Sequence, residues 1–216
     1  MNLSRSDLLK LRAEVARLRH DSLQSPQTKE NGTNENDSLE SAMRLWVSRV
    51  NRLKQRLEEM PEKKIPELQF LTAEEWLDVG QSYFEDDKGT NIGRVLSELR
   101  RMGKSRFANL AGYALNEYTI ANNGELPNEL SQLQPYFTSP VSDDILQRYK
   151  LLHTGKLADL PNSEPIIGEK AIVDEKFDSR FTIGAYEWTW EATGVFASGK
   201  QTGSWDTSRI KKFINK

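Results

Sequence analysis

The sequence predicts an α+β protein in which helices come first and a small antiparallel sheet follows. Apolar residues recur every three or four positions from residue 39 to about residue 118, as they do in amphipathic helices. Beyond Ser142, short segments rich in β-branched and aromatic residues are bounded by Gly, Pro and Asp, a pattern typical of strands. Because the two patterns occupy separate parts of the chain, we expect a long central helix packed on the sheet.

Composition excludes several classes of protein. The 216 residues include no cysteine, which rules out disulfides, zinc–thiolate sites and thiolate nucleophiles. A net charge of −2 provides no general attraction to nucleic acid, so we expect no nucleic-acid partner. No apolar run is long enough to span a bilayer. As the sequence stands, we expect a cytoplasmic location, or a periplasmic or envelope location if an N-terminal anchor precedes this chain.

The N-terminal region divides into a helix and a linker. Leu8, Leu11, Val15 and Leu18 are spaced as in a heptad seam and predict a short amphipathic helix over residues 1–20. Residues 21–37 are rich in Ser, Asn, Gly and Pro, and we expect a flexible linker there.

A stronger heptad seam predicts a helical arm within residues 38–91. The seam consists of Leu39, Met43, Trp46, Val50, Leu53 and Leu57, and Pro61 ends the run. Two interpretations stay open: the seam packs on the chain's own C-terminal domain, or it binds a protein partner or a second copy. Further along the arm, Thr72 and Glu75 form a capping box that predicts the start of another helix.

The α+β domain is expected over residues 92–200. A helix from Ile92 should run for nearly thirty residues and close through a left-handed cap at Asn122–Asn123–Gly124. Pro127 prevents the helix from resuming, and one further turn should place Leu130 and Leu133 inward. Tyr136 and Phe137 would then anchor this crossover to the core.

The C-terminal part is expected to form strands near Tyr149–His153, in "EPIIGEKAIV" and in "SRFTIGAYEWTW", with a bulge or turn at Gly184–Ala185. Residues 201–216 are expected to form a basic tail. Tyr186, Trp188 and Trp190 alternate along a strand and would share one face. That face could stack on sugar rings as a candidate ligand face, or it could be the core face that covers the long helix.

Reactive side chains do not gather in the sequence. His20 and His153 lie far apart, and no nucleotide-binding, hydrolase or metalloprotease motif occurs. Asp174, Glu175 and Asp178 lie close together but lack the glycine turn of a calcium loop, so we expect a solvated turn whose acids pair with Lys176 or Arg180. We therefore expect a protein without a cofactor, a metal or catalytic activity.

One motif resembles a known family. Tyr118, Asn123, Gly124, Leu126 and Pro127 match the "Y....NG.LP" pattern that ends the helix in the soluble part of type II secretion pseudopilins. The resemblance covers about residues 92–185 and implies a pseudopilin-like core. Residues 39–137 and "RYKLLHTGKL" through "DSRF" are also similar to an uncharacterised family of bacterial proteins. That similarity implies a bacterial source and an envelope location, and it implies no activity.

These observations favour a bacterial structural or interaction protein that assembles through the heptad seam. The resemblance implies that it is associated with the envelope or with secretion. Two alternatives remain: a glycan- or ligand-binding module that uses the aromatic strand, and a cytoplasmic coiled-coil regulatory partner protein.

Overall fold

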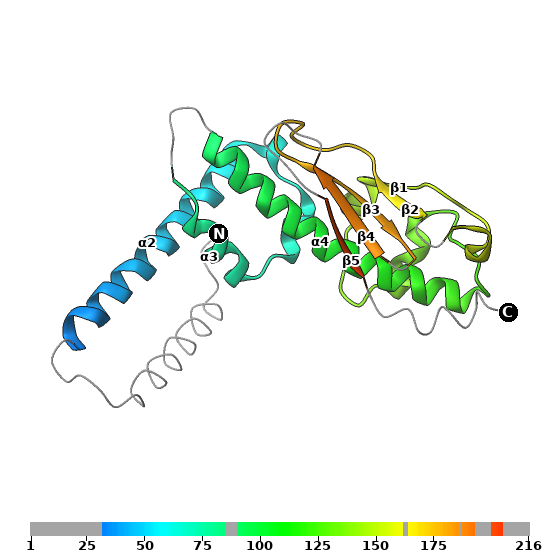
Figure 1. Ribbon diagram of the computed structural model, residues 1–216, viewed down its shortest axis with the longest axis horizontal. Coiled ribbons are helices and arrows are strands. Elements are labelled where there is room, and N and C mark those ends of the chain that lie inside the picture. Colours follow the sequence, from blue (N-terminus) through cyan, green and yellow to red (C-terminus); the bar gives the residue numbers. More distant parts are fainter. Residues whose placement is uncertain (1–31, 85–89, 162–163, 186, 193–199, 205–216) are drawn as a thin grey trace. The chain divides into compact units, whose positions relative to one another are not determined.

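The computed structural model describes residues 32–84, 90–161, 164–185, 187–192 and 200–204 (Figure 1). The chain divides into two compact units, Met1–Arg49 and Val50–Lys216. The boundary falls inside helix α2 (Gly32–Glu59). The predicted helix over residues 1–20, the first part of the predicted linker and most of the predicted basic tail lie outside the described residues.

The helical region begins earlier than expected. Residues 32–37, which were predicted to belong to the linker, form the first turns of α2. After α2 come two short 3-10 helices, η1 (Pro61–Lys63) and η2 (Pro66–Phe70), and then α3 (Ala73–Gln81). The predicted capping box at the start of α3 is confirmed. The Glu75 amide donates to Thr72 Oγ1 at 3.2 Å, and the Thr72 amide donates to Glu75 Oε2 at 2.8 Å.

The long central helix is α4 (Thr90–Ala121). It ends as expected, because Asn123 and Gly124 both adopt positive φ, 53° and 86°. The Gly124 amide donates to the carbonyl of Thr119 at 2.7 Å, which closes the last turn. The crossover that follows contains η3 (Leu130–Tyr136) and α5 (Asp143–Gln147), and Leu133 is fully buried as predicted.

The sheet has five antiparallel strands in the order β1-β2-β3-β4-β5. They are β1 (Tyr149–Leu151), β2 (Pro165–Glu169), β3 (Ser179–Gly184), β4 (Glu187–Ala192) and β5 (Lys200–Ser204). A further short 3-10 helix, η4 (Leu157–Asp159), lies between β1 and β2. The predicted α+β class and antiparallel sheet are confirmed. The expected start of a tail at residue 201 is wrong, because residues 200–204 pair with β4 as an edge strand.

Two apolar clusters pack along α4. The first half of α4 supplies Val95, Leu96 and Leu99 to a cluster with the C-terminal part of α2, with η2 and with α3. Its second half packs on the sheet, the crossover and α5, with Phe107 and Leu115 among the buried residues. Figure 1 shows α4 running along one face of the sheet. We call these the helical core and the sheet core, and the segment of α4 between Leu99 and Phe107 joins them.

Candidate functional site

A network of buried charges lies where the two cores meet. Arg100 and Lys104 are on the α4 segment between the cores, and each is 1% exposed. They share a helix face because they are one turn apart. Gly103 lies on the same segment, where its Cα is so near η2 that an added Cβ would come within 2.9 Å of the Glu67 carbonyl oxygen. The close contact brings η2 onto α4 and places the Glu67 side chain inside the protein.

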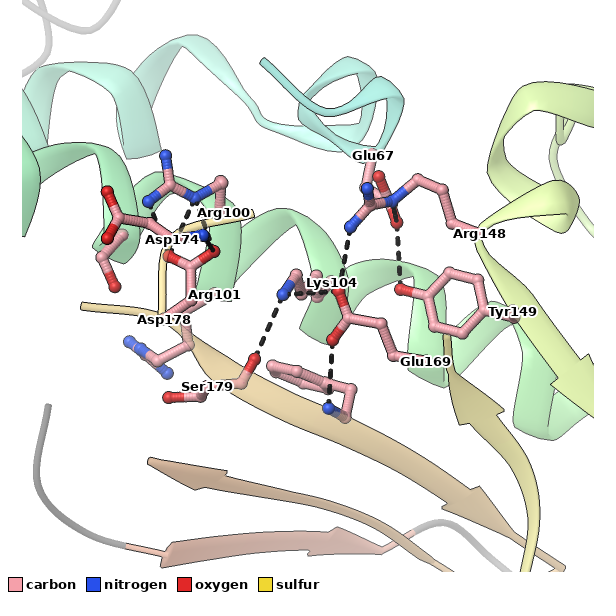
Figure 2. Close-up of polar contacts among 12 residues, drawn as sticks. Glu67, Arg100, Arg101, Lys104, Arg148, Tyr149, Glu169, Asp174, Asp178 and Ser179 are labelled. Atoms are coloured by element: carbon pink, nitrogen blue, oxygen red, sulfur yellow. Dashed lines mark hydrogen bonds and ion pairs between the residues drawn. The ribbon is translucent and has the colours of Figure 1, made fainter. Parts of the chain in front are cut away.

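The first part of the network connects α4, β2, β1 and η2 through Arg148, the residue that follows α5 (Figure 2). Lys104 Nζ lies 2.7 Å from Glu169 Oε1, and Arg148 NH2 donates to the same oxygen at 2.9 Å. Arg148 Nε also donates to Glu67 Oε1 at 2.8 Å, and the Tyr149 hydroxyl donates to that oxygen at 3.0 Å. Two cations and two carboxylates thus balance in charge, and Arg148 bridges the two carboxylates.

The second part of the network pairs α4 with the segment before β3. The Arg100 guanidinium donates from Nε and NH2 to Asp178 Oδ1 at 2.9 and 2.6 Å, and Asp178 is 1% exposed. Next to it, Lys63 Nζ lies 2.8 Å from Asp174 Oδ2. The expected solvated turn is therefore wrong for Asp178. Its carboxylate is buried because Arg100, far away in the sequence, supplies a partner inside the protein.

The pKa values of three network groups, Glu169, Tyr149 and Arg148, are raised, each through a different balance of burial and neighbouring charge. Burial raises the pKa of the Glu169 carboxyl, and the Lys104 and Arg148 cations only partly offset this effect. Burial, with the nearby Glu67 and Glu169 carboxylates, raises the pKa of the Tyr149 hydroxyl well above its ordinary value. Burial acts to lower the pKa of Arg148, but the Glu67 and Glu169 carboxylates and Tyr149 together outweigh it, and the pKa is raised.

The network makes further hydrogen bonds to main-chain groups of the sheet. Lys104 Nζ also donates to the Ser179 carbonyl at 3.1 Å, and the Phe181 amide donates to Glu169 Oε2 at 3.3 Å. Glu67 Oε2 is the one network oxygen for which the described residues provide no hydrogen-bond donor. In the described part of the chain, no three His, Asp or Glu side chains are arranged to hold a metal ion. The bonds of the network are made within the protein, and they link η2 and the sheet to α4.

The predicted heptad seam divides into two parts. Val50, Leu53 and Leu57 are buried inside the protein, the last two in the helical core, so their assignment to a partner interface is wrong. The reason is the position of α3: an added Cβ at Gly80 would come within 2.5 Å of the Val50 side chain. Three seam residues remain accessible, since Leu39 is 47% exposed and Met43 and Trp46 are half-buried. We call Leu39, Met43 and Trp46 the α2 stripe.

Of the three aromatic residues Tyr186, Trp188 and Trp190, Trp188 does not face a ligand site. This side chain is 8% exposed, stacks on Phe181 with ring centres 5.8 Å apart, and donates from Nε1 to Asn109 Oδ1 at 2.8 Å. For Trp188 the ligand-face alternative is therefore wrong and the core-face alternative is confirmed, because α4 and the sheet core cover this side chain. Trp190 belongs to β4, where its backbone pairs with Phe181 and Gln201. Tyr186 and the Trp190 side chain lie outside the described residues.

Sequence reasoning missed the charge network because its members are far apart in the chain. One signal was present: Arg100 and Lys104 fall on the apolar face of α4, in line with Leu96 and Phe107. Charged residues in an apolar stripe need buried partners, and a search for carboxylates in strand segments would have found Glu169. His153, by contrast, is a partly exposed residue whose Nε2 lies 3.1 Å from Glu164 Oε1.

Comparisons with known proteins give no relative for this chain: no family model, curated protein or solved structure matches it. In the part of the chain that the structure describes, none of the helices combines the length and the apolar character needed to cross a membrane.

Proposed function

We propose that the protein is a non-catalytic bacterial interaction protein that assembles through the α2 stripe. The supporting observation is the division of one continuous heptad pattern. Its C-terminal part is buried in the helical core, whereas Leu39, at its N-terminal end, is 47% exposed. Apolar seam positions that the chain leaves accessible are typical of helices that bind other helices.

The charge network supports the non-catalytic part of this proposal. Its cations and carboxylates are bonded to one another and to main-chain groups, so they hold the cores in register instead of facing a substrate. The sequence also resembles pseudopilins and an uncharacterised bacterial family. On the basis of that resemblance, we propose that the assembly is bacterial and lies near the envelope.

Site-specific photo-cross-linking in cells that make the protein tests this function. A photoreactive amino acid at Leu39 should give a covalent adduct with another protein chain. The same group at Tyr113, which lies on α4 and is 49% exposed, serves as a control of matched exposure and should give none. Equal yields of adduct at the two positions, or no adduct at Leu39, would contradict the proposal.

A further inference from the structure

We propose that Asn123 is a site of spontaneous deamidation, and that the capped end of α4 keeps this reaction slow in the folded protein. Asparagine followed by glycine is especially prone to deamidation, because glycine has no side chain to hinder the attacking main-chain nitrogen. The sequence contains two such pairs, Asn31–Gly32 and Asn123–Gly124. The second pair lies wholly among the residues that the structure describes, and Asn123 is exposed to solvent there.

The reaction needs no partner other than water. The Gly124 main-chain nitrogen gives up its proton and attacks the side-chain Cγ of Asn123. As the bond from this nitrogen to Cγ forms, the bond from Cγ to Nδ2 breaks, and ammonia leaves with the proton. One water molecule then opens the five-membered imide at either of its two carbonyl carbons. The product is aspartate or, where the main chain continues through the side-chain carbons, isoaspartate.

The helix cap restrains the attacking atom. The Gly124 amide donates to the Thr119 carbonyl at 2.7 Å, and Asn123 and Gly124 hold φ values of 53° and 86°. An amide in such a bond keeps its proton until the last turn of the helix opens, as it does in hydrogen exchange. Because the attack requires the nitrogen to lose this proton, deamidation proceeds through the opened state of the cap.

Contacts beyond the cap oppose this opening. The Gly124 carbonyl accepts from the Leu157 amide at 2.9 Å, and the Leu126 amide donates to the Gly155 carbonyl at 2.7 Å. Leu126 and Leu157 are both buried in the sheet core. The turn at Asn123 is therefore attached to a second segment of the chain, and its opening breaks main-chain bonds on both sides of Gly124.

Both products weaken the cap that protects the site. Each places a carboxylate near the C-terminus of α4, where the helix dipole favours positive charge. Isoaspartate also adds one carbon atom to the main chain between residues 123 and 124, so the bond from the Gly124 amide to Thr119 loses its geometry. Because deamidation is irreversible, the weakened cap is a one-way change that accumulates with the age of the molecule.

Peptide mapping by mass spectrometry of the purified full-length chain measures deamidation at each pair. In guanidinium chloride at neutral pH, Asn31 and Asn123 should react at similar rates, because no fold protects either of them. Under native conditions, Asn123 should react about ten-fold more slowly than in denaturant. This ratio corresponds to the net contribution of one or two hydrogen bonds that must open before the attack.

A substitution that is remote in the sequence separates protection by the cap from a general effect of folding. Gly155 has a φ of 91°, and an added Cβ would lie in open space among the described residues, so Gly155→Ala strains the segment that holds the cap without a clash. It should speed deamidation of native Asn123 by about three-fold and leave the rate in denaturant unchanged. Thr72→Ala is the matched control: it weakens the cap of α3 and should leave the native rate at Asn123 unchanged.

Equal rates at Asn123 in native buffer and in denaturant would overturn the protection by the cap, as would equal acceleration by Gly155→Ala and Thr72→Ala. Absence of deamidation at Asn123 from both the native wild type and native Gly155→Ala would overturn the site itself. The deamidated chain, separated by ion exchange, should melt at a lower temperature than the unreacted chain. An equal melting temperature would overturn the weakening of the cap.

Discussion

Removing one member of the buried Arg100–Asp178 pair should destabilise the protein far more than removing one member of an exposed pair. Both side chains are at most 2% exposed, and three donor–acceptor contacts of 2.6 to 3.0 Å join them. Arg100→Met leaves the Asp178 carboxylate buried without its cation. A buried charge that loses its partner costs about 3–5 kcal/mol of unfolding free energy, a large part of the 5–15 kcal/mol that is typical of a whole domain.

The double variant Arg100→Met/Asp178→Val should recover most of this loss. Replacing both members of a buried pair by apolar residues is often nearly neutral for the free energy of unfolding. A small loss should remain, because the Asp174 amide donates to Asp178 Oδ2 at 3.2 Å and loses this acceptor at a cost of about 1 kcal/mol. The assay is urea unfolding at neutral pH, followed by far-ultraviolet circular dichroism.

The Arg106–Glu75 pair is the matched control. Its N–O distance is 2.8 Å, but the Arg106 side chain is 53% exposed, so Arg106→Met should cost no more than about 1 kcal/mol. If Arg100→Met costs as little as Arg106→Met, or if the effects of the two single substitutions at Arg100 and Asp178 simply add, the reasoning about the buried network is refuted.

Three further predictions follow from single contacts. Gly103→Ala should lower the unfolding free energy by about 1–3 kcal/mol, although alanine favours helices, because its Cβ meets the Glu67 carbonyl at 2.9 Å; an unchanged or higher melting temperature would contradict this. Thr72→Ala should cost about 1 kcal/mol in the same urea assay through loss of the α3 cap, and no change would mean that the cap is dispensable. Partial burial acts to raise the pKa of Asp174, but Lys63 and neighbouring groups outweigh it and hold the pKa below its ordinary value. The ionised Asp174 therefore stabilises the fold above the ordinary aspartate pKa, and this stabilisation is lost as the pH falls through the folded-state pKa. Asp174→Asn should flatten the acid side of the curve of unfolding free energy against pH. An unchanged slope would contradict the lowered pKa of Asp174.

Local chemistry made parts of the fold predictable. The capping box at Thr72 and the left-handed cap at Asn123 and Gly124 depend on residues that are adjacent in the chain, so their sequence signals are sufficient. The α+β class followed from periodicity in the same way. Strand β5 was missed because its residues, rich in Gly, Ser and Thr, resemble a loop, and its pairing with β4 stabilises it as a strand.

Long-range packing determined what the sequence could not reveal. Leu39 and Leu53 occupy equivalent heptad positions, yet one is 47% exposed and the other fully buried, because η2 and α3 pack on the C-terminal part of α2. Periodicity describes a helix face but does not identify what covers it. Likewise, the charges of Lys104 and Glu169 resemble ordinary surface residues until β2 and α4 come together and pair them inside the protein.

The most direct test of whether the α2 stripe binds a second copy of this chain is sedimentation equilibrium of the purified chain over a range of concentrations, with Leu39→Asp run beside it. We expect the wild-type mass to rise from 24.7 kDa toward twice that value as the concentration increases. Leu39→Asp should stay at the monomer mass and keep the wild-type melting temperature, since Leu39 lies outside both cores. A wild-type mass that does not depend on concentration, or a Leu39→Asp variant that associates equally well, would contradict self-assembly through this surface.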